Sequence, residues 1–140
     1  MRHIVIVKKL SLNQSILDER GVVRFLQVEE SHILSLRLKG HVIATGGSVV
    51  YSPKAMAHLK RSGIAVFLDL SLPLLLERIQ DMDSRGIAMA PGQDLGTLYR
   101  ERRPLYDRYA DIRICCDQKG HEAVLREVLA RLASYSPTGC

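Results

Sequence analysis

The sequence predicts an α/β fold, a three-layer, doubly wound parallel sheet with helices on both faces. Four short runs rich in β-branched residues are apolar on both sides of the pleat, as strands covered on two faces are. Segments with helical periodicity separate these runs, and strands that alternate with helices favour parallel pairing. The predicted strands are residues 2–7, 41–45, 64–70 and 111–115.

Each predicted helix combines an apolar stripe at close to 3.6-residue spacing with residues typical of helix ends. Ser52 is expected to cap the second helix, and Gly63 to end it. Ser71 and Asp94 are the expected caps of the third and fourth helices, and Pro104 is expected to bend or split the fourth. The predicted helices are residues 22–38, 53–61, 72–80, 95–109 and 120–134.

Size and composition predict an ordinary globular protein. With 140 residues, 46% hydrophobic and 25% charged, we expect one domain over residues 1–140. No apolar run reaches the ~20 residues of a membrane helix, so we expect a cytoplasmic protein without a membrane partner. We also expect a monomer. The net charge of +5 is scattered and aromatic residues are only 5%, which argues against nucleic acid. The three cysteines form no zinc pattern, so no metal ligands are assigned.

Ligands of open parallel sheets bind beyond the carboxyl ends of the strands. Gly46 and Gly47 directly follow the second predicted strand. Glycines let a ligand approach the backbone and use its amide donors, although a plain strand-to-helix turn has the same pattern.

Arginines follow along the same chain. Residues 81–93 contain glycines and a proline, and we expect them to form a mobile lid. Arg78 lies just before this lid, and Arg85 lies near its start. An arginine on such a lid can fold over a phosphate. Arg102 or Arg103 would suit a carboxylate or phosphate. Taken singly, Arg78 and Arg85 are better explained as solvated surface residues. The alternative explanation for Arg102 and Arg103 is an exposed helix with Glu–Arg pairs.

The order of these segments resembles the shikimate kinase family, which has the P-loop nucleoside monophosphate kinase-like fold. The resemblance covers about residues 16–132 and implies transfer of the ATP γ-phosphate, with Mg²⁺, to a hydroxyl of shikimate, a step of aromatic amino acid biosynthesis. It rests on the segments VIATGG (42–47), VFLDL (66–70), LLER (75–78), SR (84–85), RRPLY (102–106) and AD (110–111).

The resemblance also implies roles for single residues. Gly46 and Gly47 would line the site shared by the acceptor and the γ-phosphate. Arg102 would bind the shikimate carboxylate. Arg85 would be the catalytic lid arginine that reaches the transferred phosphate, and Arg78 would lie against the adenine of ATP. In such a reaction, positioning and charge neutralisation supply most of the catalysis.

One departure concerns the nucleotide. Such kinases hold their phosphates with G-x-x-x-x-G-K-[ST] after the first strand, yet no glycine of this sequence is followed by lysine. The Asp-x-Asp segment of the family is missing as well. Either both segments are deleted from the protein, or the printed chain omits them. We favour omission because three ligand-type arginines are retained, and omission predicts backbone breaks at Val7–Lys8 and Leu12–Asn13.

Further departures concern the acceptor. Ser48 replaces a third glycine, Leu26 replaces a second arginine that holds shikimate, and Gly86 replaces the proline after the lid arginine. A related kinase for another hydroxylated acceptor therefore stays open. The alternatives from other classes are a non-catalytic small-molecule-binding or regulatory domain on the same fold and, least favoured, a basic nucleic-acid module.

Overall fold

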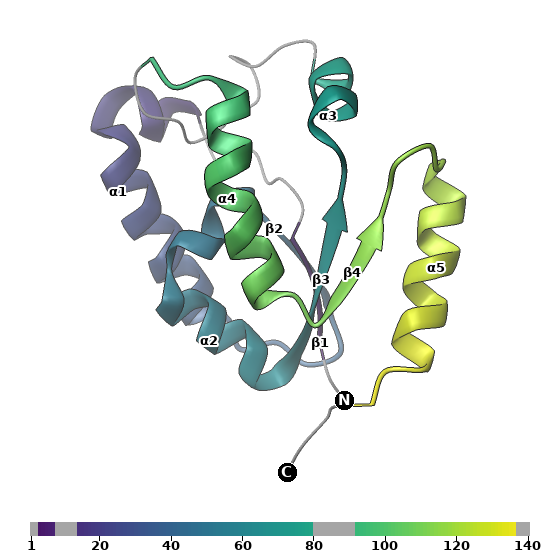
Figure 1. The fold of residues 1–140 in the computed structure, drawn as a ribbon. Coiled ribbons are helices and arrows are strands. Elements are labelled where there is room, and N and C mark those ends of the chain that lie inside the picture. The colour runs from purple at the N-terminus through teal and green to yellow at the C-terminus, as the bar shows by residue number, and fades with distance from the viewer. Residues whose placement is uncertain (1–2, 8–13, 80–91, 137–140) are drawn as a thin grey trace.

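Figure 1 shows the computed structural model of the chain, which describes residues 3–7, 14–79 and 92–136, with the side chains of 3–7, 14–20 and 62 excepted. Within these ranges the strands form one parallel sheet in the order β2-β1-β3-β4. The strands are β1 (His3–Val7), β2 (Val42–Thr45), β3 (Gly63–Asp69) and β4 (Ile112–Cys115).

The helices lie close to their predicted positions. They are α1 (Gln14–Ser35), the 3₁₀ helix η1 (Gly47–Tyr51), α2 (Pro53–Ser62), α3 (Leu72–Arg78), α4 (Leu95–Tyr109) and α5 (His121–Ala133). α1 begins earlier than predicted, but Gly21 interrupts it with φ 72° and ψ 173°, so the part after this kink starts where the prediction placed it. A left-handed φ of this kind is readily adopted only by glycine.

Two predicted helix caps are confirmed. Ser52 Oγ accepts a hydrogen bond from the Ala55 N–H at 3.0 Å, and Asp94 Oδ1 accepts one from Thr97 at 2.6 Å. Ser71 occupies the N-cap position of α3, but its side chain makes no cap bond, so that part of the prediction is wrong. α4 is one continuous helix that contains Pro104, so the proline does not split it.

Helices cover both faces of the sheet, which confirms the predicted fold class. Phe67 of β3 packs against Tyr106 of α4, with 5.0 Å between ring centroids, on the face that carries α1, α2 and α4. The neighbouring Val66 points to the opposite face and belongs to the buried cluster with Val128 of α5. Successive strand residues point to opposite faces, so one strand contributes to both cores.

The expectation that every strand is covered on two faces is wrong for β2. Ile43 packs against the core formed with α1 and α2. On the other side of the strand Val42 is 62% exposed and Ala44 is exposed. The reason is the strand order: β2 is an edge strand, and α5 packs against β4 at the far edge of the sheet.

Several predictions fall on residues that the structure does not describe. The junctions Val7–Lys8 and Leu12–Asn13 adjoin or lie within residues 8–13, and Arg85 and most of the predicted lid lie within residues 80–91. In the ranges that are described, none of the helices is both long and apolar enough to cross a membrane.

Asp111 is predicted to be a major source of stability, because its carboxylate ties the link between α4 and β4 to both α2 and β3. It accepts bonds from Lys60 Nζ at 2.7 Å and from the Ala65 N–H at 2.8 Å. Asp111→Ala should lower the free energy of unfolding by about 1–3 kcal/mol, because the half-buried Ala65 N–H loses its partner and the Lys60 ammonium keeps only the Tyr109 carbonyl. Urea unfolding followed by circular dichroism measures it.

The matched control is Glu122→Ala, since this carboxylate is 91% exposed and pairs with Arg126 at 3.6 Å. It should change the unfolding free energy by less than about 0.5 kcal/mol. Equal effects of the two substitutions would contradict the role of Asp111.

Candidate functional site

A buried turn follows β2 at the carboxyl edge of the sheet. Gly46 is extended, with φ −65° and ψ 153°, and leads into η1, whose Ser48, Val49 and Val50 are buried. α4 packs across η1. The turn therefore places the backbone of Gly46 and Gly47 beneath α4, at the edge where parallel sheets bind ligands.

Tyr106 of α4 approaches Gly47 closely. The Tyr106 hydroxyl donates a hydrogen bond to the Gly47 carbonyl at 2.8 Å. A Cβ atom on residue 47 would lie 2.7 Å from that hydroxyl and 3.4 Å from Nη1 of Arg102. The first distance is too short for a real Cβ contact, so a side chain here would require the Tyr106 ring to shift. Gly47 thus permits the hydrogen bond and the close approach of α4 to the turn.

Arg102 is buried beside this contact and is only 7% exposed. Its Nε donates to the hydroxyl of Tyr51 at 3.2 Å, and its guanidinium carbon lies 5.1 Å from the centroid of the Tyr51 ring. The Tyr51 hydroxyl in turn donates to Glu101 at 2.6 Å. Burial and the bond to Glu101 raise the pKa of Tyr51. The guanidinium is therefore fixed in place by a hydroxyl that stays protonated.

Glu29 of α1 joins this group from the other side. It is 5% exposed, and its Oε2 accepts a hydrogen bond from the Ser48 hydroxyl at 2.7 Å. Burial raises the pKa of the Glu29 carboxyl, and the bond from Ser48 and the charge of Arg102 only partly offset this. Three elements, α1, η1 and α4, thus meet around one arginine and one buried acid.

A groove of about 220 Å³ opens between α1 and η1 beside these residues. Its apolar wall is Val23 and Leu26, and its polar wall includes the carboxyl groups of Glu29 and Glu30. Because two carboxyl groups line the groove, it favours the hydroxyl groups of a ligand over a negatively charged group. The groove is lined by Val23, Leu26, Gln27, Glu29, Glu30, Ser48, Tyr51 and Ser52.

The family model described as shikimate kinase matches residues 7–133. The chain belongs to the shikimate kinase family.

Known members are similar over most of their length. The shikimate kinase of Aquifex aeolicus is 32% identical over 124 residues, which are 88% of this chain and 72% of the relative. The shikimate kinase of Caldanaerobacter subterraneus is 32% identical over 117 residues, 81% of this chain and 68% of the relative. A solved shikimate kinase from Acinetobacter baumannii in complex with shikimate superposes with a TM-score of 0.78 at 21% identity, over 96% of this chain and 94% of that one, which shows the shared fold.

The structure brings together three of the residues that the family resemblance singled out. Gly46, Gly47 and Arg102 lie in the same turn-and-helix contact. Arg78 ends α3 with an exposed side chain, and its charge acts on the Cys116 thiol, whose pKa is raised chiefly by burial. Arg85 lies outside the described residues.

The structure also separates Arg102 from Arg103, which the residue pattern left open and between which only the family resemblance chose. Arg103 Nη2 donates to Asp69 at 3.1 Å, and Arg113 Nε donates to the same carboxylate oxygen at 2.9 Å. Burial alone would raise the pKa of Asp69, but the two guanidinium groups outweigh it and hold that pKa below its usual range. Successive helix residues point about 100° apart, so Arg103 holds α4 on β3 while Arg102 faces the turn.

Sequence reasoning missed the partners of Arg102. Glu29 carried a usable signal, because it interrupts an apolar helix stripe between Phe25 and Ile33, both of which are buried. A charged residue at a buried helix position requires a partner. Tyr51 carried no such signal, because its role arises only when η1 packs against α4.

The described residues alone show no site for ATP and Mg²⁺. Among residues 21–79 and 92–136 whose side chains are described, no three metal-ligating groups cluster. Only residues 8–13 separate β1 from α1, and no phosphate-loop motif occurs in the sequence. The hydroxyl of Thr45 is buried without a hydrogen-bond partner in the described part of the chain, next to the end of β1. The sheet edge between β1 and β2 thus retains an unpaired polar group.

The contact between Gly47 and Tyr106 is tested by a double-mutant cycle. Gly47→Ala should lower the free energy of unfolding by about 1–3 kcal/mol, the usual range for overpacking. In a Tyr106→Phe background the same change should be milder, because the oxygen that meets the new Cβ is absent. Urea unfolding of the four proteins measures the coupling, and strictly additive effects would contradict the contact.

Proposed function

We propose that the chain binds a small hydroxylated carboxylic acid of the shikimate class at Gly46, Gly47 and Arg102, as the acceptor for phosphoryl transfer from ATP with Mg²⁺. Family membership supports the class of reaction. The observation that carries the acceptor assignment is the buried guanidinium of Arg102, fixed by Tyr51 beside the glycine turn. A guanidinium in this setting suits a carboxylate.

The arrangement favours binding through preorganisation. Each charge-assisted hydrogen bond between a guanidinium and a carboxylate contributes about 1.5–3 kcal/mol. Because Tyr51 already holds Arg102, little side-chain entropy is lost when the acid binds. The bare backbone of Gly46 and Gly47 leaves room for a hydroxylated ring to approach its amides.

Leu26 weakens the fit to shikimate itself. This residue lines the groove where family members place a second arginine, so the carboxylate of the acceptor meets one guanidinium. We therefore include related hydroxylated acids that rely less on a second cation. Arg85, as the arginine that reaches the transferred phosphate, and Arg78, beside the adenine, belong to the same proposal.

A second candidate is a domain that binds the acceptor without phosphorylating it. The short connection between β1 and α1 favours it, because a phosphate loop with its following helix does not fit into six residues. Both candidates share the acceptor site and differ in the nucleotide.

The acceptor site is tested by calorimetric titration with shikimate. Arg102→Ala should weaken binding at least tenfold, since about 1.5 kcal/mol or more is lost with the charged hydrogen bonds. Leu26→Arg should strengthen binding about tenfold by adding a second cation to the groove. The control is Arg108→Ala, an exposed arginine on the same helix whose guanidinium lies over Tyr109. Absence of binding by both the wild type and Leu26→Arg would refute the acceptor assignment.

The same samples distinguish the two candidates. Shikimate-dependent formation of ADP from ATP and Mg²⁺ supports phosphoryl transfer. Shikimate binding without ADP formation supports the acceptor-binding domain.

Acceptor affinity should depend on pH through Glu29. Because burial raises the pKa of this carboxyl, lowering the pH from about 8 to about 5 protonates more of it than of an ordinary glutamate, while the acceptor carboxylate, with a pKa near 4, stays ionised. The negative charge beside Arg102 then fades, and the Kd for shikimate should fall. Glu29→Gln should bind with a Kd that changes little over this range. Weaker binding by the wild type at low pH would contradict the role of Glu29.

A further inference from the structure

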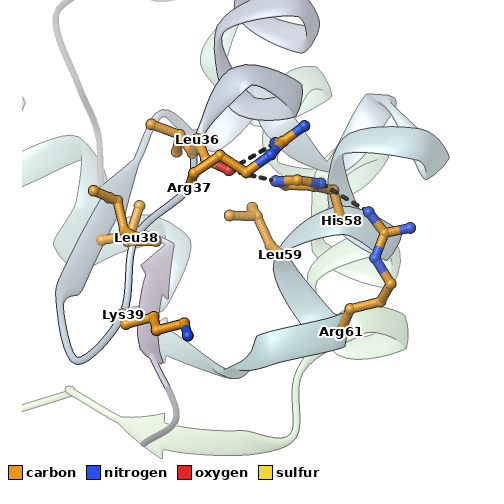
Figure 2. A pocket seen from close by; sticks show the side chains of 8 residues that line it. Leu36, Arg37, Leu38, Lys39, His58, Leu59 and Arg61 are labelled. Carbon is orange, nitrogen blue, oxygen red and sulfur yellow. Dashed lines mark hydrogen bonds between the residues drawn. The ribbon is translucent and has the colours of Figure 1, made fainter.

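A second cavity lies at the opposite edge of the sheet, where α1 and α2 both end (Figure 2). Its volume is about 280 Å³. It shares no residue with the turn, the arginine or the groove of the acceptor site. It is lined by Leu36, Arg37, Leu38, Lys39, Ile43, His58, Leu59 and Arg61.

The apolar part of this cavity is formed by leucines and one isoleucine. Leu59 is 3% exposed and anchors the cavity to the core of α1 and α2, whereas Leu38 is 37% exposed. An exposed leucine beside buried ones gives a partly open apolar surface that a small hydrocarbon group could cover.

The charged part is entirely basic. Arg37, Lys39 and Arg61 line the cavity together with His58, and no carboxylate is among the lining residues. Figure 2 shows Arg37 and His58 converging on the carbonyl of Leu36. His58 must donate from Nε2 to that carbonyl, at 3.0 Å, so its Nδ1 accepts from Arg61 Nη2 at 2.8 Å.

Part of this positive charge neutralises the carboxyl ends of α1 and α2. The carboxyl end of a helix carries about −0.5 of an elementary charge, so α1 and α2 together supply about −1. Arg37 does serve this purpose, since its Nη1 donates to the carbonyls of Leu34 and Leu36 at 2.7 and 2.9 Å. Three permanent cations nevertheless leave an excess of about +2. In the described part of the chain the Lys39 ammonium has no partner, and Arg61 uses only Nη2.

We infer that this cavity is a second ligand site, which binds a small anion consisting of one carboxylate or phosphate on an apolar body. The anionic group lies between Lys39 and Arg61, and the apolar body covers Leu38 and Leu59. The inference goes beyond the proposed function because it concerns a separate cavity and a ligand that is neither acceptor nor nucleotide.

Hexanoate is the probe, and hexanol is its uncharged control. In amide-resolved NMR titrations of the full chain, hexanoate should saturably shift the signals of residues 36–39 and 58–61 with a Kd of about a millimolar, as suits so small a ligand. Hexanol, which lacks the charge, and inorganic phosphate, which lacks the apolar body, should each bind at least about tenfold more weakly. Equal binding of hexanol, or shifts that do not saturate, would overturn the proposal.

Substitutions that remove single positive charges test which side chains bind hexanoate. Lys39→Gln and Arg61→Gln should each weaken hexanoate binding about fivefold or more, whereas Lys54→Gln, which removes an exposed cation from the other end of α2, should not. Thermal unfolding of each variant identifies any loss caused by misfolding, and Lys39 lies in a connecting segment where substitution is tolerated. Arg102→Ala should leave hexanoate binding unchanged, which separates this site from the acceptor site. Unchanged affinity in both Lys39→Gln and Arg61→Gln would overturn the proposal.

Discussion

The hydrogen bond from the Tyr106 hydroxyl to the Gly47 carbonyl brings α4 onto the turn after β2, and the proposed acceptor site depends on this approach. The missing Cβ of residue 47 leaves room for it. Once α4 is this close, Arg102, one helical turn before Tyr106, is carried into the interior next to Tyr51 and Glu29. A buried arginine is unfavourable unless hydrogen bonds and an opposite charge surround it, and η1 and α1 provide both. The absence of a side chain at Gly47 thus lets α4 bury the guanidinium of Arg102 beside the turn.

The polarity of the parallel sheet separates two kinds of chemistry. At the carboxyl edge the chain leaves each strand and begins a helix, so backbone N–H groups and the glycine turn collect there. At the amino edge the helices end, so carbonyl groups collect, and Arg37 and His58 bind them. Both edges contain arginine, but for different reasons. Arg102 is buried by packing, whereas Arg37 binds carbonyls at the end of α1 and Arg61, in the last turn of α2, binds His58 and adds to a surplus of positive charge.

Local patterns predicted most of the fold, because strands, caps and helix stripes are properties of short segments. Ser52 and Asp94 cap helices as their sequence context indicates, and β3 contributes to both faces as its continuous apolar run indicates. The family resemblance singled out Arg102, but local patterns could not separate it from Arg103, since that difference depends on the rotation of α4 about its axis relative to η1 and Asp69. The position of Tyr51 opposite Arg102 arises from the same tertiary packing. The coverage of β2 was predicted wrongly because an apolar strand sequence does not reveal whether a helix lies over it.

The uncovered side of β2 and the missing phosphate loop have one physical explanation. In a strand–loop–helix phosphate motif the helix that follows the loop returns along a face of the sheet. This chain has six residues between β1 and α1, which are too few for that helix, and the structure shows Val42 of β2 62% exposed on the face that such a helix would cover. On the same face Leu125 and Leu129 of α5 are 58% and 56% exposed. In the described part of the chain, the side proposed for the acceptor has its glycine turn and its buried arginine, whereas no described helix stands between β1 and α1 to shield the sheet beside Val42. The proposed acceptor site therefore rests on α1, η1 and α4, and the packing of these three elements does not depend on a phosphate loop.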